Sequence, residues 1–233
     1  MTTKRGNSGG ASAPGRPDDT LSETFASLRP KAILFDLLTA LIDSWSLWEK
    51  IAGNAEDGRR WRGVYLKSTY AEGRYRPYEV LLRAAAVAAG LRVEIADQLV
   101  ARYGELEPWP EVAEVLGRLR GKIPLGIVTN CSEVLGQLAV SRTGIDFDTV
   151  VTAERAGFYK PDPHPYRLAL DELGVAAADC LFVAGSAYDL FGAAAVGLPV
   201  FWHDRIGMAM PDGAPPPLLR ADTLYPLQRL VLG

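Results

Sequence analysis

The stretch KAILFDLLTALIDS, residues 31–44, contains an apolar run that ends on one acid. The run 32–35 is short and has no polar alternation, which is typical of a strand covered on both faces of a parallel sheet. Asp36 follows it directly. A carboxylate among apolar neighbours is costly unless a partner pairs with it. We therefore expect Asp36 to have fixed partners or to take part in chemistry.

The rest of the chain repeats this strand pattern. Further runs rich in Ile, Val, Leu and Phe occur at residues 125–128, 150–151, 181–183 and 199–202. Segments of helical length and period lie between the later runs, at residues 132–143, 164–173 and 188–196. Such alternation predicts an α/β fold with a Rossmann-like, doubly wound parallel sheet, in which ligands bind beyond the carboxyl ends of the strands.

One interval departs from the alternation. Between Asp43 and Pro108 the sequence shows helical patterns only, at residues 45–52, 59–70, 78–89 and 95–103. An all-helical insert after the first strand predicts a cap over the same edge of the sheet. The expected organisation is a core domain of residues 26–43 and 108–233, a cap domain of residues 44–107, and a disordered tail of residues 1–25, rich in Gly, Ser, Pro and charge.

Composition narrows the class of function. The chain has 233 residues, 48% of them hydrophobic and 23% charged, as expected for a soluble globular protein. A net charge of -3 gives no basic stripe for nucleic acid, and no apolar run approaches the ~20 residues that span a bilayer. We expect neither as a partner. Cys131 and Cys180 lack CxxC spacing and are interpreted as reduced, which favours the cytoplasm.

Polar residues follow four of the predicted strands, and their order resembles the haloacid dehalogenase superfamily. The motifs, within residues 31–205, are FDLLTALIDS (35–44), IVTNCS (127–132), YKPDPHPY (159–166) and LFVAGSAYDLFGAAAVGLPVFW (181–202). The resemblance implies a Rossmann-like core, a helical cap, and an aspartate nucleophile that forms an ester later hydrolysed by water.

Two positions separate the branches of this superfamily. Its magnesium phosphatases carry a second Asp two residues after the nucleophile and an acid directly before the Ser of the last loop; here these positions are Leu38 and Gly185. A hard divalent cation needs several oxygen ligands, so the sequence disfavours a phosphatase. The resemblance points instead to the metal-free 2-haloacid dehalogenases, with a small-molecule carboxylate substrate and neither metal nor cofactor.

The resemblance also implies roles for individual residues. Asp36 would attack the saturated carbon next to the substrate carboxylate, and a 2-hydroxy acid would be released. Lys160 would keep Asp36 ionised, while Asp189 would steady Lys160 and help direct the water. The residues expected to be catalytic are Asp36, Lys160, Asp189 and Ser186. The residues expected to bind substrate are Leu38, Thr129, Asn130, Trp48, Tyr65, Tyr166 and Tyr188.

Several departures keep alternatives open. Ala40 stands where dehalogenases have threonine, and Tyr188 where they have tryptophan. Their cap arginine has no clear counterpart; the nearby candidates are Arg59, Arg60, Arg62, Arg74 and Arg76. A changed leaving-group pocket suggests a ring-opening L-azetidine-2-carboxylate hydrolase of the same superfamily as an alternative. A magnesium phosphatase and a non-catalytic binding member are further alternatives. Because dehalogenases of this type are often dimers, the resemblance also makes a homodimer possible.

Overall fold

A parallel sheet forms the centre of the computed structural model, which describes Phe25 and residues 27–232. Its strand order is β3-β2-β1-β4-β5-β6. The strands are β1 (Ala32–Phe35), β2 (Leu125–Thr129), β3 (Thr149–Thr152), β4 (Cys180–Ala184), β5 (Val200–His203) and β6 (Leu219–Ala221). The order reverses at β1, as in other doubly wound folds, where ligands bind at the switch point. The predicted Rossmann-like architecture is confirmed.

The strand register brings the carboxyl ends of β1, β2 and β4 together. Phe35, the last residue of β1, pairs with Ile127 of β2 and with Val183 of β4. All residues of these three strands are buried, in keeping with their continuous apolar sequences. The segments that follow β1, β2 and β4 therefore meet at one edge of the sheet.

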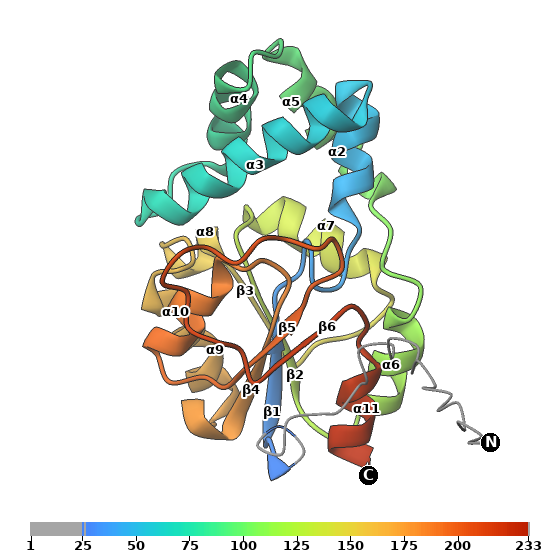
Figure 1. Ribbon diagram of the computed structural model, residues 1–233, viewed down its shortest axis with the longest axis vertical. Helices are drawn as coiled ribbons and strands as arrows, with labels where there is room; N and C mark the ends of the chain where they lie inside the picture. The colour runs from blue at the N-terminus through green and yellow to red at the C-terminus, as the bar shows by residue number, and fades with distance from the viewer. Residues whose placement is uncertain (1–24, 26, 233) are drawn as a thin grey trace, which may run out of the picture.

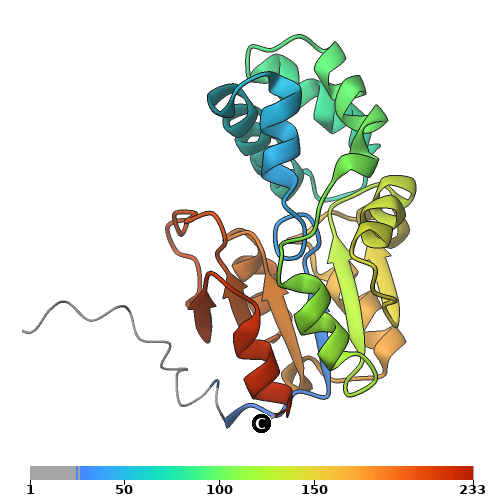
Figure 2. The ribbon, with the colours of Figure 1, turned by 90° about the vertical axis from the view of Figure 1, so that its right-hand side faces the viewer.

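Helices cover both faces of the sheet (Figure 2). Alternate residues of β1 divide between the two layers: Ile33 and Phe35 belong to one apolar cluster, Ala32 and Leu34 to the other. The first layer contains α6 (Val112–Leu119), α7 (Glu133–Arg142) and α11 (Tyr225–Leu232). The second contains α9 (Pro163–Leu173) and α10 (Asp189–Ala195), with the short α8 (Ala153–Ala156) and the 3-10 turn η2 (Ala177–Asp179) nearby.

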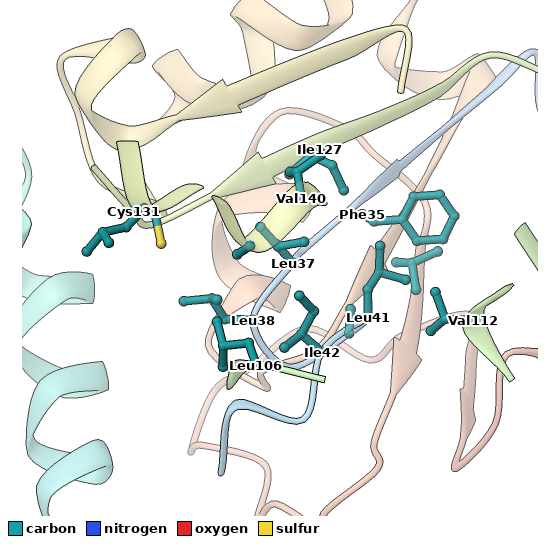
Figure 3. Packing of buried hydrophobic residues seen from close by; sticks show 14 of the residues in the cluster. Phe35, Leu37, Leu38, Leu41, Ile42, Leu106, Val112, Ile127, Cys131 and Val140 are labelled. Carbon is teal, nitrogen blue, oxygen red and sulfur yellow. The ribbon is translucent and has the colours of Figure 1, made fainter. Parts of the chain in front are cut away.

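The loop after β1 is anchored by its own apolar side chains. Leu37, Leu41 and Ile42 are fully buried, and they point into the cluster that also contains Leu106 and Val112 (Figure 3). This packing fixes the backbone that follows Asp36 in the chain, since a close-packed interior leaves little room for movement.

A set of helices lies above the carboxyl edge of the sheet (Figure 1). We call residues 44–107 the helical insert; it contains α2 (Ser44–Ala52), α3 (Ala55–Glu72), α4 (Tyr78–Ala88), α5 (Glu94–Ala101) and the 3-10 turn η1 (Tyr103–Glu105). Asp43 caps α2 by accepting a hydrogen bond from the Ser46 amide at 3.1 Å. The interior of the helical insert is aromatic, and the ring centroids of Trp48 and Trp61 lie 4.3 Å apart.

The helical insert contacts the core on two sides of Asp36. On one side, the two connecting segments pair with each other through an Ile42 and Pro108 bridge. On the other side, beyond the end of α3, the Tyr159 amide donates to Gly73 O at 2.7 Å and the Tyr75 amide donates to Gly157 O at 2.8 Å. These contacts hold α3 directly over the strand ends.

The predicted tail, residues 1–25, lies outside the described residues except for Phe25. Phe25 is buried, and its ring centroid lies 5.8 Å from that of Phe201. No helix in the described part of the chain is long and apolar enough to cross a membrane.

Candidate active site

One ammonium group lies between two carboxylates at the carboxyl edge of the sheet. Lys160 Nζ is 2.8 Å from Asp36 Oδ1 and 2.9 Å from Asp189 Oδ1. Asp36 is 6% exposed, and Lys160 and Asp189 are 0% exposed. Buried charges are stable only when paired and hydrogen-bonded. The three side chains therefore form one ionic unit.

Backbone contacts position this unit. Asp36 is held by its amide, which donates to Val183 O at 2.9 Å. Asn130, directly after β2, clamps the backbone of Lys160: its Oδ1 accepts from the Lys160 amide at 2.7 Å and its Nδ2 donates to Lys160 O at 3.1 Å. The Tyr65 hydroxyl donates to Asn130 O at 2.9 Å, so the helical insert supports the same clamp.

The charged groups of the ionic unit shift one another's pKa values. Burial alone would lower the pKa of Lys160, but the carboxylates of Asp189 and Asp36 outweigh burial and raise it above its ordinary value. Burial raises the pKa of Asp189, against the opposing effect of Lys160. Lys160 is therefore firmly cationic at neutral pH.

Arg62 of α3 is a second buried cation, and it has no anionic partner among the described residues. It is 1% exposed, and its Nη2 donates to Thr39 Oγ1 at 3.0 Å and to Leu38 O at 3.3 Å. Its Nε and Nη1 make no hydrogen bond within the described part of the chain. The guanidinium lies 4.7 Å from the centre of the Trp45 ring. A desolvated cation with neutral partners and free donors is suited to receive an anion.

Gly185 packs against the loop of the nucleophile candidate. A Cβ at this position would lie 2.8 Å from Asp36 Oδ2 and would overlap the backbone of Thr39 and Ala40. The position thus has no room for an acidic side chain, and the side chain of Leu38 carries no oxygen. No group of three His, Cys, Asp or Glu side chains in residues 25 and 27–232 is arranged to hold a metal ion. The donor set at Asp36 therefore does not fit a magnesium centre.

A small cavity separates Asp36 from the helical insert. The volume open to the centre of a water-sized sphere is about 20 Å³, and the lining residues are Asp36, Leu38, Thr39, Arg62, Tyr65, Leu66, Thr69, Tyr70, Thr129, Asn130 and Ser186. Such a volume holds about one water molecule. A larger hollow of about 440 Å³ opens beside Trp109 and Arg205, but none of the expected site residues lines it.

Comparison with known proteins agrees with this geometry. Residues 30–197 match the family described as haloacid dehalogenase-like hydrolase. The chain belongs to this family. An (S)-2-haloacid dehalogenase of Pseudomonas putida is 30% identical over 192 residues, which cover 75% of this chain and 85% of that relative.

Solved structures of dehalogenases are also similar to this haloacid dehalogenase-like hydrolase. A dehalogenase with an intermediate complex is 26% identical, with a TM-score of 0.78 over 88% of this chain and 99% of that chain. An L-2-haloacid dehalogenase is 28% identical, with a TM-score of 0.75 over 88% of this chain and 99% of that chain. The resemblance stated from the motifs is thereby confirmed.

The hydrolase brings most of the expected site residues to the cavity. The expected residues that line it are Asp36, Leu38, Tyr65, Thr129, Asn130 and Ser186. Lys160 and Asp189 do not line it; both are fully buried, and Lys160 contacts Asp36. The Ser186 hydroxyl accepts from the Tyr188 amide at 3.2 Å and contacts Met208 Sδ at 3.7 Å. Its hydroxyl makes no hydrogen bond to the ionic unit. Its backbone does: Ser186 O accepts from the Asp189 amide at 3.1 Å, and the Ser186 amide lies 3.4 Å from Asp189 Oδ2.

Three of the expected substrate-binding residues lie outside the cavity lining. Trp48 is 0% exposed and packs within the helical insert, where its ring is 5.1 Å from Tyr65. Tyr166 packs edge-on against Phe182 at 5.3 Å, with its hydroxyl buried and unbonded within the described residues. The Tyr188 ring lies against Tyr70, with centroids 5.3 Å apart.

Five residues that line the cavity were not among those expected from the sequence: Thr39, Arg62, Leu66, Thr69 and Tyr70. Arg62 appeared only as one of five nearby arginines. The spacing could have distinguished it, because the buried residues of α3 recur at helical intervals: Gly58, Trp61, Arg62, Tyr65, Leu66 and Thr69. An arginine within an otherwise uncharged buried stripe is a candidate ligand for an anion.

Proposed function

We propose that this protein is a metal-independent hydrolase that displaces halide from the saturated carbon next to a carboxylate, giving a 2-hydroxy acid. The observation that carries the proposal is the buried unit of Asp36, Lys160 and Asp189 beneath the anion-free guanidinium of Arg62. The names of similar proteins, (S)-2-haloacid and L-2-haloacid dehalogenases, agree with it.

In the first step an oxygen of Asp36 attacks C2 of the substrate. A carbon–oxygen bond forms as the carbon–halogen bond breaks, and the bonding electrons leave with the halide. Arg62 receives the departing halide, since it is the cation of the cavity that is not already paired with a carboxylate. The buried Thr129 hydroxyl, which makes no hydrogen bond within the described residues, is available to the substrate carboxylate.

In the second step water opens the ester. The water oxygen attacks the ester carbonyl carbon, and one of its protons passes by way of Asp189 to the departing alkoxide. Asp36 regains its carboxylate and the second proton goes to solvent. The products are the 2-hydroxy acid, halide and a proton. Lys160 stays paired with Asp189 throughout, because their contact does not depend on Asp36.

The alternatives fit the site less well. A phosphatase would need an acid at position 185, where a Cβ already overlaps the nucleophile loop. A ring-opening azetidine hydrolase would bring a ring nitrogen, cationic when protonated, beside the buried guanidinium of Arg62, where like charges repel. A binding member without turnover would have no use for a buried nucleophile and lysine pair.

The helical insert acts as the cap in this proposal, supplying Arg62, Tyr65 and Leu66 to the cavity. A cytoplasmic location is proposed because both cysteines are free and buried. Burial raises the pKa of Cys131 to about 11 and that of Cys180 to about 12, so both are neutral thiols. A homodimer stays a prediction.

The test is a substrate panel of L-2-chloropropionate, fluoroacetate, L-azetidine-2-carboxylate and p-nitrophenyl phosphate, assayed once with chelator and once with added magnesium, with Asp36→Asn as the inactive control. We expect chelator-resistant halide release that is absent in Asp36→Asn. Turnover of the phosphate ester alone, dependent on added magnesium, would contradict the proposal. Turnover of the azetidine alone would keep the nucleophile but change the leaving group.

A further inference from the structure

Tyr70 of α3 reaches from the helical insert to the ionic unit. Its hydroxyl donates to Asp189 Oδ1 at 2.5 Å, the same oxygen that receives Lys160 Nζ at 2.9 Å. We propose that Tyr70 is a positioning residue for hydrolysis of the Asp36 ester, because it holds Asp189 in the orientation that activates water. This inference rests on the proposed function, in which Asp189 relays the proton.

The structure fixes Tyr70 firmly. It lies near the C-terminal end of α3, which runs above α8 and α10 (Figure 1). Just beyond it, Gly73 O accepts a hydrogen bond from the Tyr159 amide of the core at 2.7 Å. The Tyr188 ring covers one side of the Tyr70 ring. The phenol is therefore placed by both the helical insert and the core.

The two oxygens of Asp189 are unequally engaged. Oδ1 accepts from both Tyr70 and Lys160, whereas Oδ2 has one long contact, 3.4 Å from the Ser186 amide. A carboxylate oxygen can accept about two hydrogen bonds, so Oδ1 is filled and Oδ2 keeps acceptor capacity for a further hydrogen bond. Tyr70 thus determines which oxygen of Asp189 takes the proton.

The contribution of Tyr70 belongs to the second step. No hydrogen bond of Tyr70 involves Asp36 or Lys160 within the described residues, so the attack on C2 does not need it directly. Once Asp36 is an ester it is no longer an anion, and Asp189 becomes the only carboxylate paired with Lys160. Tyr70 then supplies the second strong hydrogen bond that prevents Asp189 from turning.

Tyr70 also affects the proton affinity of Asp189. Lys160, Asp36, Tyr70 and Tyr166 are the titratable groups that face this carboxyl. Burial raises the pKa of Asp189, and the hydrogen bond from Tyr70 partly offsets that rise. Without the phenol the pKa should rise further, so the acid limb of ester hydrolysis should move to higher pH.

The experiment compares Tyr70→Phe with Tyr75→Phe in rapid-quench reactions with L-2-chloropropionate. Tyr75 is a matched control, since it lies at the same junction, stacks on Tyr159 with centroids 5.5 Å apart, and does not line the cavity. Chloride, 2-hydroxy acid and the mass of the Asp36 peptide are measured at each time, and the hydrolysis rate is followed from pH 5 to 9.

For Tyr70→Phe we expect a near-normal chloride burst, accumulation of the Asp36 ester, and hydrolysis slowed about tenfold or more, the size of effect that loss of a hydrogen bond to a charged group produces. The acid limb of hydrolysis should move upward. Tyr75→Phe should show none of these changes.

Three results would overturn the inference. One is Tyr70→Phe hydrolysing the ester at the wild-type rate. Another is equal slowing of both steps with no shift in the pH profile, which marks a structural role. The third is a wild-type protein that releases no chloride, which rejects the proposed function and this inference with it; an active wild type with an unaffected variant rejects the inference alone.

Discussion

At the scale of single residues, the site keeps its charges in balance. Asp36 and Asp189 are matched by Lys160 and Arg62, all of them buried. A substrate carboxylate adds one negative charge, and ester formation then neutralises Asp36 while the new halide appears beside Arg62. Lys160 thus keeps a carboxylate partner in Asp189 throughout the proposed reaction, and Arg62 gains its anion when the halide departs.

Arg62 provides the first test at this scale. Arg62→Met should lower kcat/KM about 100-fold or more, by analogy with the loss of one preorganised donor to a developing anion. The variant should still fold, because it removes an unpaired buried charge that is costly to desolvate, at the loss of two hydrogen bonds. Chloride release and thermal unfolding measure the two effects.

The matched control is Arg59→Met, which removes an exposed arginine of the same helix that pairs with Glu49. It should leave kcat/KM unchanged. An Arg62→Met protein that is fully active, or inactive only because it no longer folds, would contradict the role of Arg62.

Lys160 gives a prediction in pH. Its carboxylate neighbours outweigh burial and raise its pKa above the usual value, so its positive charge should persist to higher pH than that of an ordinary lysine, about 10.4. The kcat/KM for L-2-chloropropionate should therefore show no alkaline loss from Lys160 between pH 7 and about 10. A fall in the kcat/KM of the wild-type protein with a midpoint near pH 8, absent in Lys160→Arg, would show that the pKa of Lys160 is lowered rather than raised.

At the scale of elements, the ends of β1 and β4 are packed too closely for side chains of ordinary size. Gly185, directly after β4, touches the loop after β1 at the backbone of Ala40. The same loop follows Asp36, whose carboxyl lies 2.8 Å from Lys160 Nζ. The contact with this loop makes position 185 a sensitive probe of the site.

Gly185→Ala should destabilise the protein by about 1–3 kcal/mol, typical for overpacking, and should reduce activity strongly because the new Cβ approaches Asp36 Oδ2. Gly117→Ala in α6 is the control, since a Cβ there meets no atom within 4 Å and alanine favours a helix. Urea unfolding and chloride release provide the measurements. A fully active, equally stable Gly185→Ala would show that the loop packing does not position Asp36.

The elements that were predicted from sequence are those with a clear period. The apolar runs at residues 32–35 and 181–183 differ from β1 and β4 by no more than two residues. β6 was not predicted, because Leu219–Ala221 is a short edge strand with Arg220 exposed at its centre and no apolar pattern. Strand pairing along β5, rather than local sequence, determines it.

The site residues divide in the same way, into those marked by a local sequence pattern and those determined by tertiary contacts. Asp36, Lys160 and Asp189 were predicted because each lies in a motif, following a predicted strand, that resembles the haloacid dehalogenase superfamily. Tyr70 could not be predicted in this way, since its contact with Asp189 spans 119 residues and depends on how the helical insert docks. The packing of Trp48 away from the cavity depends on how α2 and α3 of the helical insert pack against each other.

At the scale of the whole molecule, the cavity is shaped by both parts of the chain. Leu38 lines it from the core and Leu66 from the helical insert, and little free volume remains between them. With both ends of the insert in contact with the core, we expect the closed site to accept small acids only.

Each methylene added to L-2-chloropropionate should therefore lower kcat/KM about tenfold or more, as when a substrate exceeds an apolar pocket. Leu66→Ala should restore part of the loss for L-2-chlorobutyrate. Leu138→Ala, at a partly exposed position of α7, should not. Equal rates across the series would show that the site is not closed by the helical insert during turnover.

The central claim is that Asp36 forms the ester, and the most direct measurement is a single turnover of L-2-chloropropionate in ¹⁸O-labelled water with enzyme in excess. The account predicts that the label enters the Asp36 carboxylate, while the first 2-hydroxy acid released carries an unlabelled oxygen from Asp36. Label in the first product with an unlabelled Asp36 peptide would mean that water attacks the substrate directly, and it would contradict the account.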